Sequence, residues 1–236
     1  MNVDGFLTAG KPRFSSGKAA SMSLGSSPER VRLYTHEFPG AHSKTQVEGA
    51  IELLIKATPT DASQSRTLAI DVTVDNSRTG HSMPSGSADL RLLWLEVTAH
   101  IGDRILALPA GAAESAVTTD SISNSIAGYG NFDARLIGPE IPKGSRVYRA
   151  IFADAKGQAT LNSYDAVAKL FDNRLKAAEK RMESYQLTIP EGVKGNLSIE
   201  ATLKYLPYSS TFTDGLGLPK PEAVIVARKK IELGSR

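Results

Sequence analysis

The chain has 236 residues, of which 41% are hydrophobic and 22% are charged, and its formal net charge is +3. This composition predicts a folded chain with a buried core rather than a disordered one. The small positive excess, without a dense basic run, argues against a nucleic-acid partner. No apolar stretch approaches the length of a membrane span. Cysteine is absent, which excludes disulfides, Cys-based metal sites and covalent attachment of haem c by this chain.

Residues 1–28 are rich in Ser, Gly and Ala and show little hydrophobic periodicity, so we expect an irregular lead-in segment. They also lack the apolar run of a signal peptide. This predicts either a cytosolic chain or the mature or trimmed part of an exported protein. The Gly-Ser-Arg ending at 234–236 favours the interpretation that this chain is a fragment of a longer protein. We expect residues 29–236 to form a single β-sandwich domain.

Most of the remaining chain shows the residue pattern of β-strands. Between Leu68 and Asp75 apolar residues recur at every second position, which predicts a half-buried strand. Residues 90–98 are apolar enough for a central strand, and Gly102-Asp103 predicts a hairpin turn after it. About eight strands with turn residues between them predict an antiparallel β-sandwich, Ig-like or jelly-roll-like. The longer expected strands are 46–58, 66–76, 89–100, 145–153, 182–189, 197–205 and 223–232.

Two stretches interrupt the strand pattern. Residues 108–142 are small and polar and predict a long loop excursion, a kind of loop that is more often functional than decorative. Residues 162–181 carry apolar side chains at helical spacing, which predicts one short helix. The alternative is that the second half of this stretch leads straight into the next strand.

Two of the four histidines flank a turn. His36 and His42 lie on either side of Pro39-Gly40, whose residue types shape the loop. Neutral imidazole is the commonest side-chain ligand of transition metals and also binds haem iron. Six-residue spacing is not a standard metal pair, so two partly exposed loop histidines are an equal alternative. His100 ends a predicted strand, where a satisfied or solvated side chain is expected.

His81 lies in a loop between two strong predicted strands. Gly80 and Gly86 bend this loop and Pro84 stiffens it. A histidine fixed on such a loop can act as a ligand or as a hydrogen-bonding post for the loop itself. Met83 is a conceivable soft ligand, although a methionine in this setting more often packs.

Catalytic motifs are missing from the sequence. It contains neither a Gly-x-Ser-x-Gly elbow nor a His-Glu-x-x-His motif, so we expect no enzyme. A His-based metal hydrolase would need carboxylates that converge on His36, His42 and His81, and it stays the third interpretation.

Three segments together resemble the cysteine-free β-sandwich region that follows the haem-bearing part of multihaem c-type cytochromes. They are the turn at 36–42, the loop at 76–86 with Trp94 downstream, and the stretch 171–205. The resemblance spans about residues 31–232. It implies an exported electron-transfer protein, periplasmic or extracellular, whose sandwich packs on haems and lends a histidine as an axial ligand.

On that resemblance, His81, His42 and His36 are the candidate axial ligands. The chain would bind no metal by itself, and haem c would belong to a haem-bearing cytochrome domain or subunit as its partner. The alternative function is a structural or adhesive surface module that binds another protein, because sandwich folds host many such functions. That alternative predicts dispensable histidines and binding through an exposed apolar patch or a sheet edge.

Overall fold

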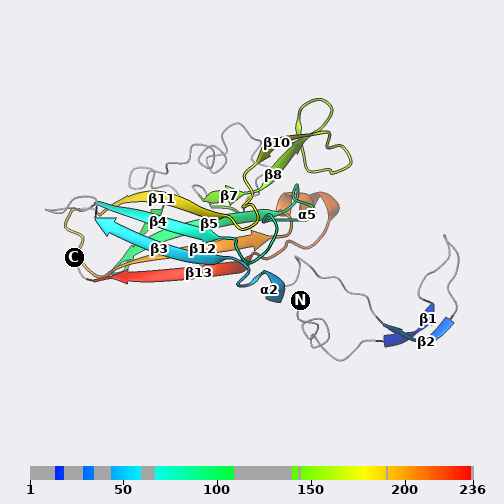
Figure 1. Cartoon of the computed structure of the whole chain (residues 1–236), viewed down its shortest axis with the longest axis horizontal. Coiled ribbons are helices and arrows are strands. Elements are labelled where there is room, and N and C mark those ends of the chain that lie inside the picture. Colours follow the sequence, from blue (N-terminus) through cyan, green and yellow to red (C-terminus); the bar gives the residue numbers. More distant parts are fainter. Residues whose placement is uncertain are drawn as a thin grey trace. The chain divides into compact units, whose positions relative to one another are not determined.

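The computed structural model describes residues 14–18, 29–34, 44–59, 67–108, 140–142, 145–189 and 191–234. It confirms the predicted fold class, because antiparallel strands dominate and the two large sheets of the larger unit form a sandwich (Figure 1). The chain divides into two compact units, Met1–Gly40 and Ala41–Arg236. None of the described helices has the length and apolar character needed to cross a bilayer.

The described residues of the smaller unit form one antiparallel strand pair. Strand β1 (Phe14–Lys18) pairs with β2 (Glu29–Tyr34). The irregular lead-in predicted for residues 1–28 is therefore wrong over β1, and the compact units divide after Gly40 rather than after residue 28. Composition misses such a strand because its partner supplies the hydrogen bonds that hold it.

Three sheets are formed by the described residues of the larger unit. The first has the order β11 (Lys180–Thr188), β4 (Thr67–Asp75), β3 (Glu52–Pro59). The second has the order β13 (Val224–Leu233), β12 (Leu197–Leu206), β5 (Leu92–Ile101), β6 (Arg104–Leu108), and β7 (Arg146–Tyr148) also pairs with β5. A small third sheet has the order β10 (Ala168–Asp172), β8 (Ala150–Ala153), β9 (Ala159–Thr160). The described part of the unit also includes two short helices, α2 (Lys44–Val47) and α5 (Ser210–Leu216).

The main core draws its side chains from both large sheets. In β4 the alternate residues Leu68, Ile70, Val72 and Val74 are fully buried, which confirms the predicted period of two. Alternate residues of β5 and β12 join them in one apolar cluster. The residues that β5 contributes to this cluster are Leu93, Leu95, Val97, Ala99 and Ile101, and those from β12 are Leu197, Ile199, Ala201, Leu203 and Tyr205.

Strand β5 is buried on both faces over its first four residues, as a central strand should be. Its other face carries Leu92 and Trp94, which form a second apolar cluster with Ile141, Val147 and Leu206. The indole Nε1 of Trp94 donates to Glu96 at 2.7 Å, so this large buried ring has a partner for its only polar atom.

Several predicted strands agree with the observed ones. The predicted ranges 66–76, 197–205 and 223–232 match β4, β12 and β13 to within one residue at each end. Gly102 forms the predicted hairpin turn between β5 and β6. Most of the predicted excursion at 108–142 lies outside the described residues.

Four predicted strands have different limits in the structure. The ranges 89–100 and 182–189 correspond to β5 (Leu92–Ile101) and β11 (Lys180–Thr188), which start three residues later and two residues earlier than predicted. The range 46–58 begins too early, because Lys44–Val47 is a helical turn and the chain bends at Gly49, whose φ is 70°. The range 145–153 divides at Arg149, since β7 pairs with β5 whereas β8 pairs with β10 and β9.

The helix predicted over 162–181 is wrong. The segment forms turns, β10 and the start of β11. Its backbone bonds reach distant residues: Val167 N donates to the Ala153 carbonyl oxygen at 2.8 Å. The side-chain oxygens of Asn162 and Asp172 each accept the backbone N–H two residues ahead, a local bond that competes with helix formation.

A short helix does occur elsewhere, at Ser210–Leu216, where none was predicted. Ser209 caps its first turn by accepting from the Phe212 N–H at 3.3 Å, and Gly217 ends it with a φ of 64°. Ser at the start and Gly after the end are recognised helix signals. The helix is only seven residues long, so it lacks the apolar repeat that would mark it in sequence.

A buried carboxylate ties the two large sheets together. Glu183 on β11 accepts from Arg146 Nε at 3.1 Å and from the Tyr148 hydroxyl at 2.9 Å. Arg146 and Tyr148 belong to β7, which pairs with β5 of the other sheet. Glu183 is 2% exposed and Arg146 is fully buried, so water does not screen this ion pair.

We expect Glu183→Ala to lower the free energy of unfolding by about 3–5 kcal/mol, because the buried guanidinium loses its carboxylate. Denaturant unfolding followed by circular dichroism measures the loss. Met182→Ala, at the exposed neighbouring position on the same strand, serves as control and should change stability by no more than about 0.5 kcal/mol. Equal losses in the two variants would contradict the assignment of Glu183 as the tie.

Candidate functional site

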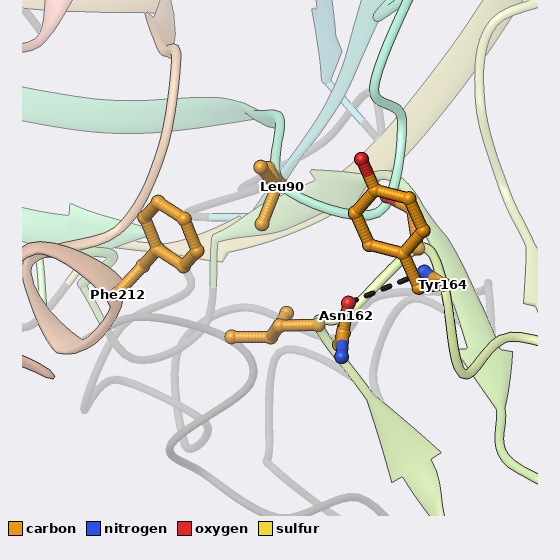
Figure 2. A pocket seen from close by; sticks show the side chains of 6 residues that line it. Leu90, Asn162, Tyr164 and Phe212 are labelled. Carbon is orange, nitrogen blue, oxygen red and sulfur yellow. Dashed lines mark hydrogen bonds between the residues drawn. The ribbon is translucent and has the colours of Figure 1, made fainter. Parts of the chain in front are cut away.

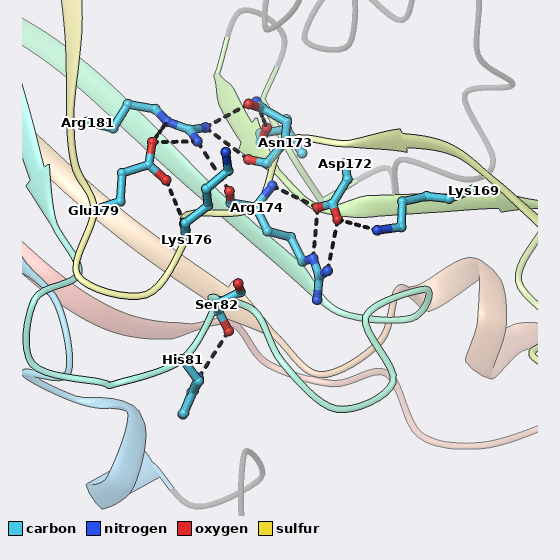
Figure 3. A network of polar contacts seen from close by, with 10 residues as sticks. His81, Ser82, Lys169, Asp172, Asn173, Arg174, Lys176, Glu179 and Arg181 are labelled. Atoms are coloured by element: carbon cyan, nitrogen blue, oxygen red, sulfur yellow. Dashed lines mark hydrogen bonds and ion pairs between the residues drawn. The ribbon is translucent and has the colours of Figure 1, made fainter.

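The loop between β4 and β5 presents His81 to solvent. Its ring nitrogen Nδ1 lies 3.0 Å from the Ser82 carbonyl oxygen. A carbonyl oxygen only accepts hydrogen bonds, so this contact favours a proton on Nδ1, and a neutral ring in that tautomer has its lone pair on Nε2. In Figure 3 the His81 side chain points away from the polar network of residues 169–181. The imidazole thus offers an accessible ring nitrogen that can act as a metal ligand.

The backbone of this loop takes conformations that suit its glycines. Gly80 and Gly86 both have a φ of 71°, in the left-handed region where L side chains are strained. Met83 is 8% exposed and belongs to the main core, so it packs instead of reaching a ligand. Pro84, next in the chain, is also buried.

Met83 also joins the loop to a second one. Its N–H donates to the Leu175 carbonyl oxygen at 2.8 Å, and the Leu175 N–H donates back to the Met83 carbonyl oxygen at 2.9 Å. The His81 loop therefore lies against the segment 173–179, which joins β10 to β11.

A guanidinium fixes this second loop from within (Figure 3). Arg181 donates to the Asn173 carbonyl oxygen at 3.0 Å, to the Asn173 Oδ1 at 2.7 Å and to the Arg174 carbonyl oxygen at 3.2 Å. Its Nε donates to Glu179 at 2.8 Å, and its guanidinium carbon lies 5.5 Å from the centre of the Tyr148 ring. The Arg181 guanidinium thus holds the 173–179 loop by donating to several of its oxygen atoms at once. A lysine ammonium could not reach all of them together.

Two aspartates near these loops are held ionised by basic partners. Arg174 forms two hydrogen bonds of 2.8 Å to the Asp172 carboxylate, and Lys169 adds a third contact at 2.8 Å. They hold the pKa of Asp172 well below its usual range. Lys180, 2.8 Å away, together with hydrogen bonds from Ser77, lowers the pKa of Asp75 from 3.8 to about 2.

An apolar pocket of about 310 Å³ lies between the turn at 161–164 and α5. Figure 2 shows the Phe212 and Tyr164 rings on either side of Leu90. The Tyr164 side chain is 97% exposed, whereas Ser163 donates at 2.6 Å to Asp89, which is itself buried. The remaining lining residues are Leu161 and Asn162.

The structure does not bring the predicted histidines together within the residues that it describes. His36 and His42, with Pro39 and Gly40 between them, lie outside those residues, so their roles stay predictions. His100 lies on β5, half-buried, with its Nε2 3.3 Å from the Thr98 hydroxyl. Over the described part of the chain, no three His, Asp or Glu side chains gather in a way that could hold a metal ion.

Comparison with known proteins gives one informative likeness. No protein-family model matches the sequence, and no curated protein matches it. A penta-haem cytochrome c552 from Thermochromatium tepidum is similar in structure, with a TM-score of 0.55 and 20% sequence identity over 85% of this chain and 44% of that chain. This chain therefore spans less than half the length of its structural neighbour. At such low identity the likeness concerns the fold.

A second solved structure aligns poorly. PapD-like domain 7 of human CEP192 covers 92% of this chain and 95% of its own, at 8% identity and a TM-score of 0.25. A score of this size supports no argument about fold or function.

The low pKa values of Asp75 and Asp172 predict a loss of stability in acid. Their ionised forms are favoured in the folded state, so their contribution is complete above the ordinary pKa of 3.8 and declines as the pH falls from about 4 to about 2. We expect the melting temperature to fall over this range in scanning calorimetry. The fall should be smaller in the double variant Asp75→Asn, Asp172→Asn.

Asp103→Asn is the matched control, because Asp103 is exposed in the turn between β5 and β6. This variant should keep the acid sensitivity of the parent chain. An equally steep acid response in the double variant would show that other carboxylates set it.

Proposed function

We propose that this chain is a non-catalytic β-sandwich accessory domain of an exported multihaem cytochrome, in which it packs beside haem groups and His81 supplies an axial ligand. The proposal locates the chain in the periplasm or outside the cell. Its partner is a haem-bearing cytochrome domain or subunit, since a chain without cysteine has no thiols for covalent attachment of haem c.

The observation that carries the proposal is the state of the His81 ring. Histidines that bind metals almost always use one ring nitrogen as ligand and donate the other N–H to a carbonyl or carboxylate. The Nδ1–H of His81 meets the Ser82 carbonyl in this way, and the ring is exposed. Haem iron, when bound to such a ligand, supplies one-electron transfer chemistry.

The fold likeness supports the same proposal. The structural alignment covers 85% of this chain and places it on part of a penta-haem cytochrome. Since the aligned region is 44% of that chain, more than half of the neighbour lies outside it and has room for haem-bearing structure. A rigid sandwich also holds a loop ligand steady, which metal coordination requires.

We expect His81→Ala, in the complete cytochrome, to convert one haem from low spin to high spin and to change one reduction potential. Electron paramagnetic resonance and a potentiometric titration measure the two effects. His100→Ala is the control and should change neither, because its imidazole is half-buried and contacts Thr98. Unchanged spectra and potentials in His81→Ala would refute the ligand role, and His36→Ala and His42→Ala test the other two candidates in the same way.

A structural or adhesive module is the second candidate, and the surface around the apolar pocket favours it. Tyr164 is 97% exposed and Val167 is 68% exposed, and exposed apolar groups beside a pocket mark interaction surfaces. If the chain is such a module, Tyr164→Ala should weaken binding of a partner that co-purifies with the native protein, whereas His81→Ala should not. Leu54→Ala, at an exposed position on β3, is the control.

A further inference from the structure

Asn76 is a buried polar residue at the base of the His81 loop. It follows the last residue of β4 and is fully buried. Its backbone N–H donates to the Glu179 carbonyl oxygen at 2.8 Å, so the start of this loop is fastened to the 173–179 loop. A buried amide side chain has to find partners for all of its polar atoms.

The Asn76 side chain finds them in both loops. Its Nδ2 group donates one hydrogen bond to the His81 carbonyl oxygen at 2.9 Å and one to the Lys176 carbonyl oxygen at 2.7 Å. Its Oδ1 accepts from the Thr79 hydroxyl at 2.7 Å. An amide has two N–H donors and one carbonyl, so this arrangement fits asparagine. Aspartate has the same size but would set a carboxylate against two carbonyl oxygens.

These bonds determine where the Ser82 carbonyl points. The peptide before Ser82 includes the His81 carbonyl oxygen, which Asn76 holds. The peptide after Ser82 includes the Met83 N–H, which the Leu175 carbonyl oxygen accepts at 2.8 Å. With the peptides on both sides fixed, the Ser82 carbonyl stays within reach of the His81 Nδ1, 3.0 Å away.

We infer that Asn76 is the positioning residue of His81: by fixing the loop it keeps the imidazole in the Nδ1–H tautomer, with Nε2 directed outward as a ligand atom. The inference rests on the proposed ligand function of His81 for its biological meaning. The tautomer itself is a property of this chain alone and is measured without haem.

The first experiment reads the tautomer directly. Long-range ¹H–¹⁵N correlation spectra of the labelled full chain, above the titration range of its histidines, distinguish protonated from unprotonated ring nitrogens. We expect the His81 Nδ1–H form to predominate in the parent and to lose its predominance in Asn76→Asp. Asn196→Asp makes the same chemical change at an exposed position and should leave the tautomer as it is.

The second experiment reads the ligand strength. The probe is a ferric haem c peptide that carries one histidine ligand of its own and leaves the sixth position open. It is titrated into the chain with His36, His42 and His100 replaced by Ala, and the Soret shift reports binding. We expect Asn76→Asp to bind at least about tenfold more weakly, the size of effect that outer hydrogen-bond partners have on metal ligands.

The outcomes separate the two ideas. If His81→Ala in this background binds the probe as tightly as its parent, the proposed ligand function fails. If His81→Ala loses binding while Asn76→Asp keeps both the tautomer and the affinity, the positioning role is overturned. If Asn76→Asp does not fold, Thr79→Val replaces it. This variant removes the hydroxyl that lies 2.7 Å from Asn76 Oδ1 and 2.8 Å from the His81 carbonyl oxygen, so it loosens the same hydrogen-bonded cluster and should shift both readouts in the same direction. No shift in either readout of Thr79→Val would then overturn the positioning role.

Discussion

The central place of β4 in its sheet is the constraint on which the rest depends. β4 pairs with β3 on one side and with β11 on the other, and its inward residues are fully buried. A slip of one residue would turn all of them toward solvent, so the register is strongly specified. The register in turn fixes where the strand ends, at Asp75, and therefore where Asn76 begins the His81 loop.

Polar groups replace the apolar core at the position where β11 faces β7. Alternation in β11 directs Arg181, Glu183 and Tyr185 to the same side. Burial raises the pKa of Tyr148 well above its ordinary value, so its hydroxyl keeps the proton that it donates to Glu183. The Arg146 guanidinium lies 5.5 Å from the centre of the Tyr185 ring. The same strand thus joins the two sheets through Glu183 and holds the 173–179 loop through Arg181.

How much of the molecule sequence alone can predict depends on how local the signal is. β4 and β12 were predictable because their apolar alternation lies within the strand itself. The segment 162–181 was not, because its helical spacing competes with bonds such as that from Val167 to Ala153, which only the folded chain provides. The same applies to the site: the sequence marks the His81 loop, but Asn76 donates to a carbonyl 100 residues away.

The loop that carries His81 keeps its shape without help from the exposed imidazole. Its anchors are backbone groups, the Asn76 amide and the Thr79 hydroxyl, while the only hydrogen bond of the His81 side chain among the described residues is to the neighbouring Ser82 carbonyl. Exposed positions without buried partners tolerate substitution at little cost in stability. Replacement of His81 should therefore leave the loop and the sandwich folded, so that a change seen in such a variant reports on the imidazole itself and not on folding.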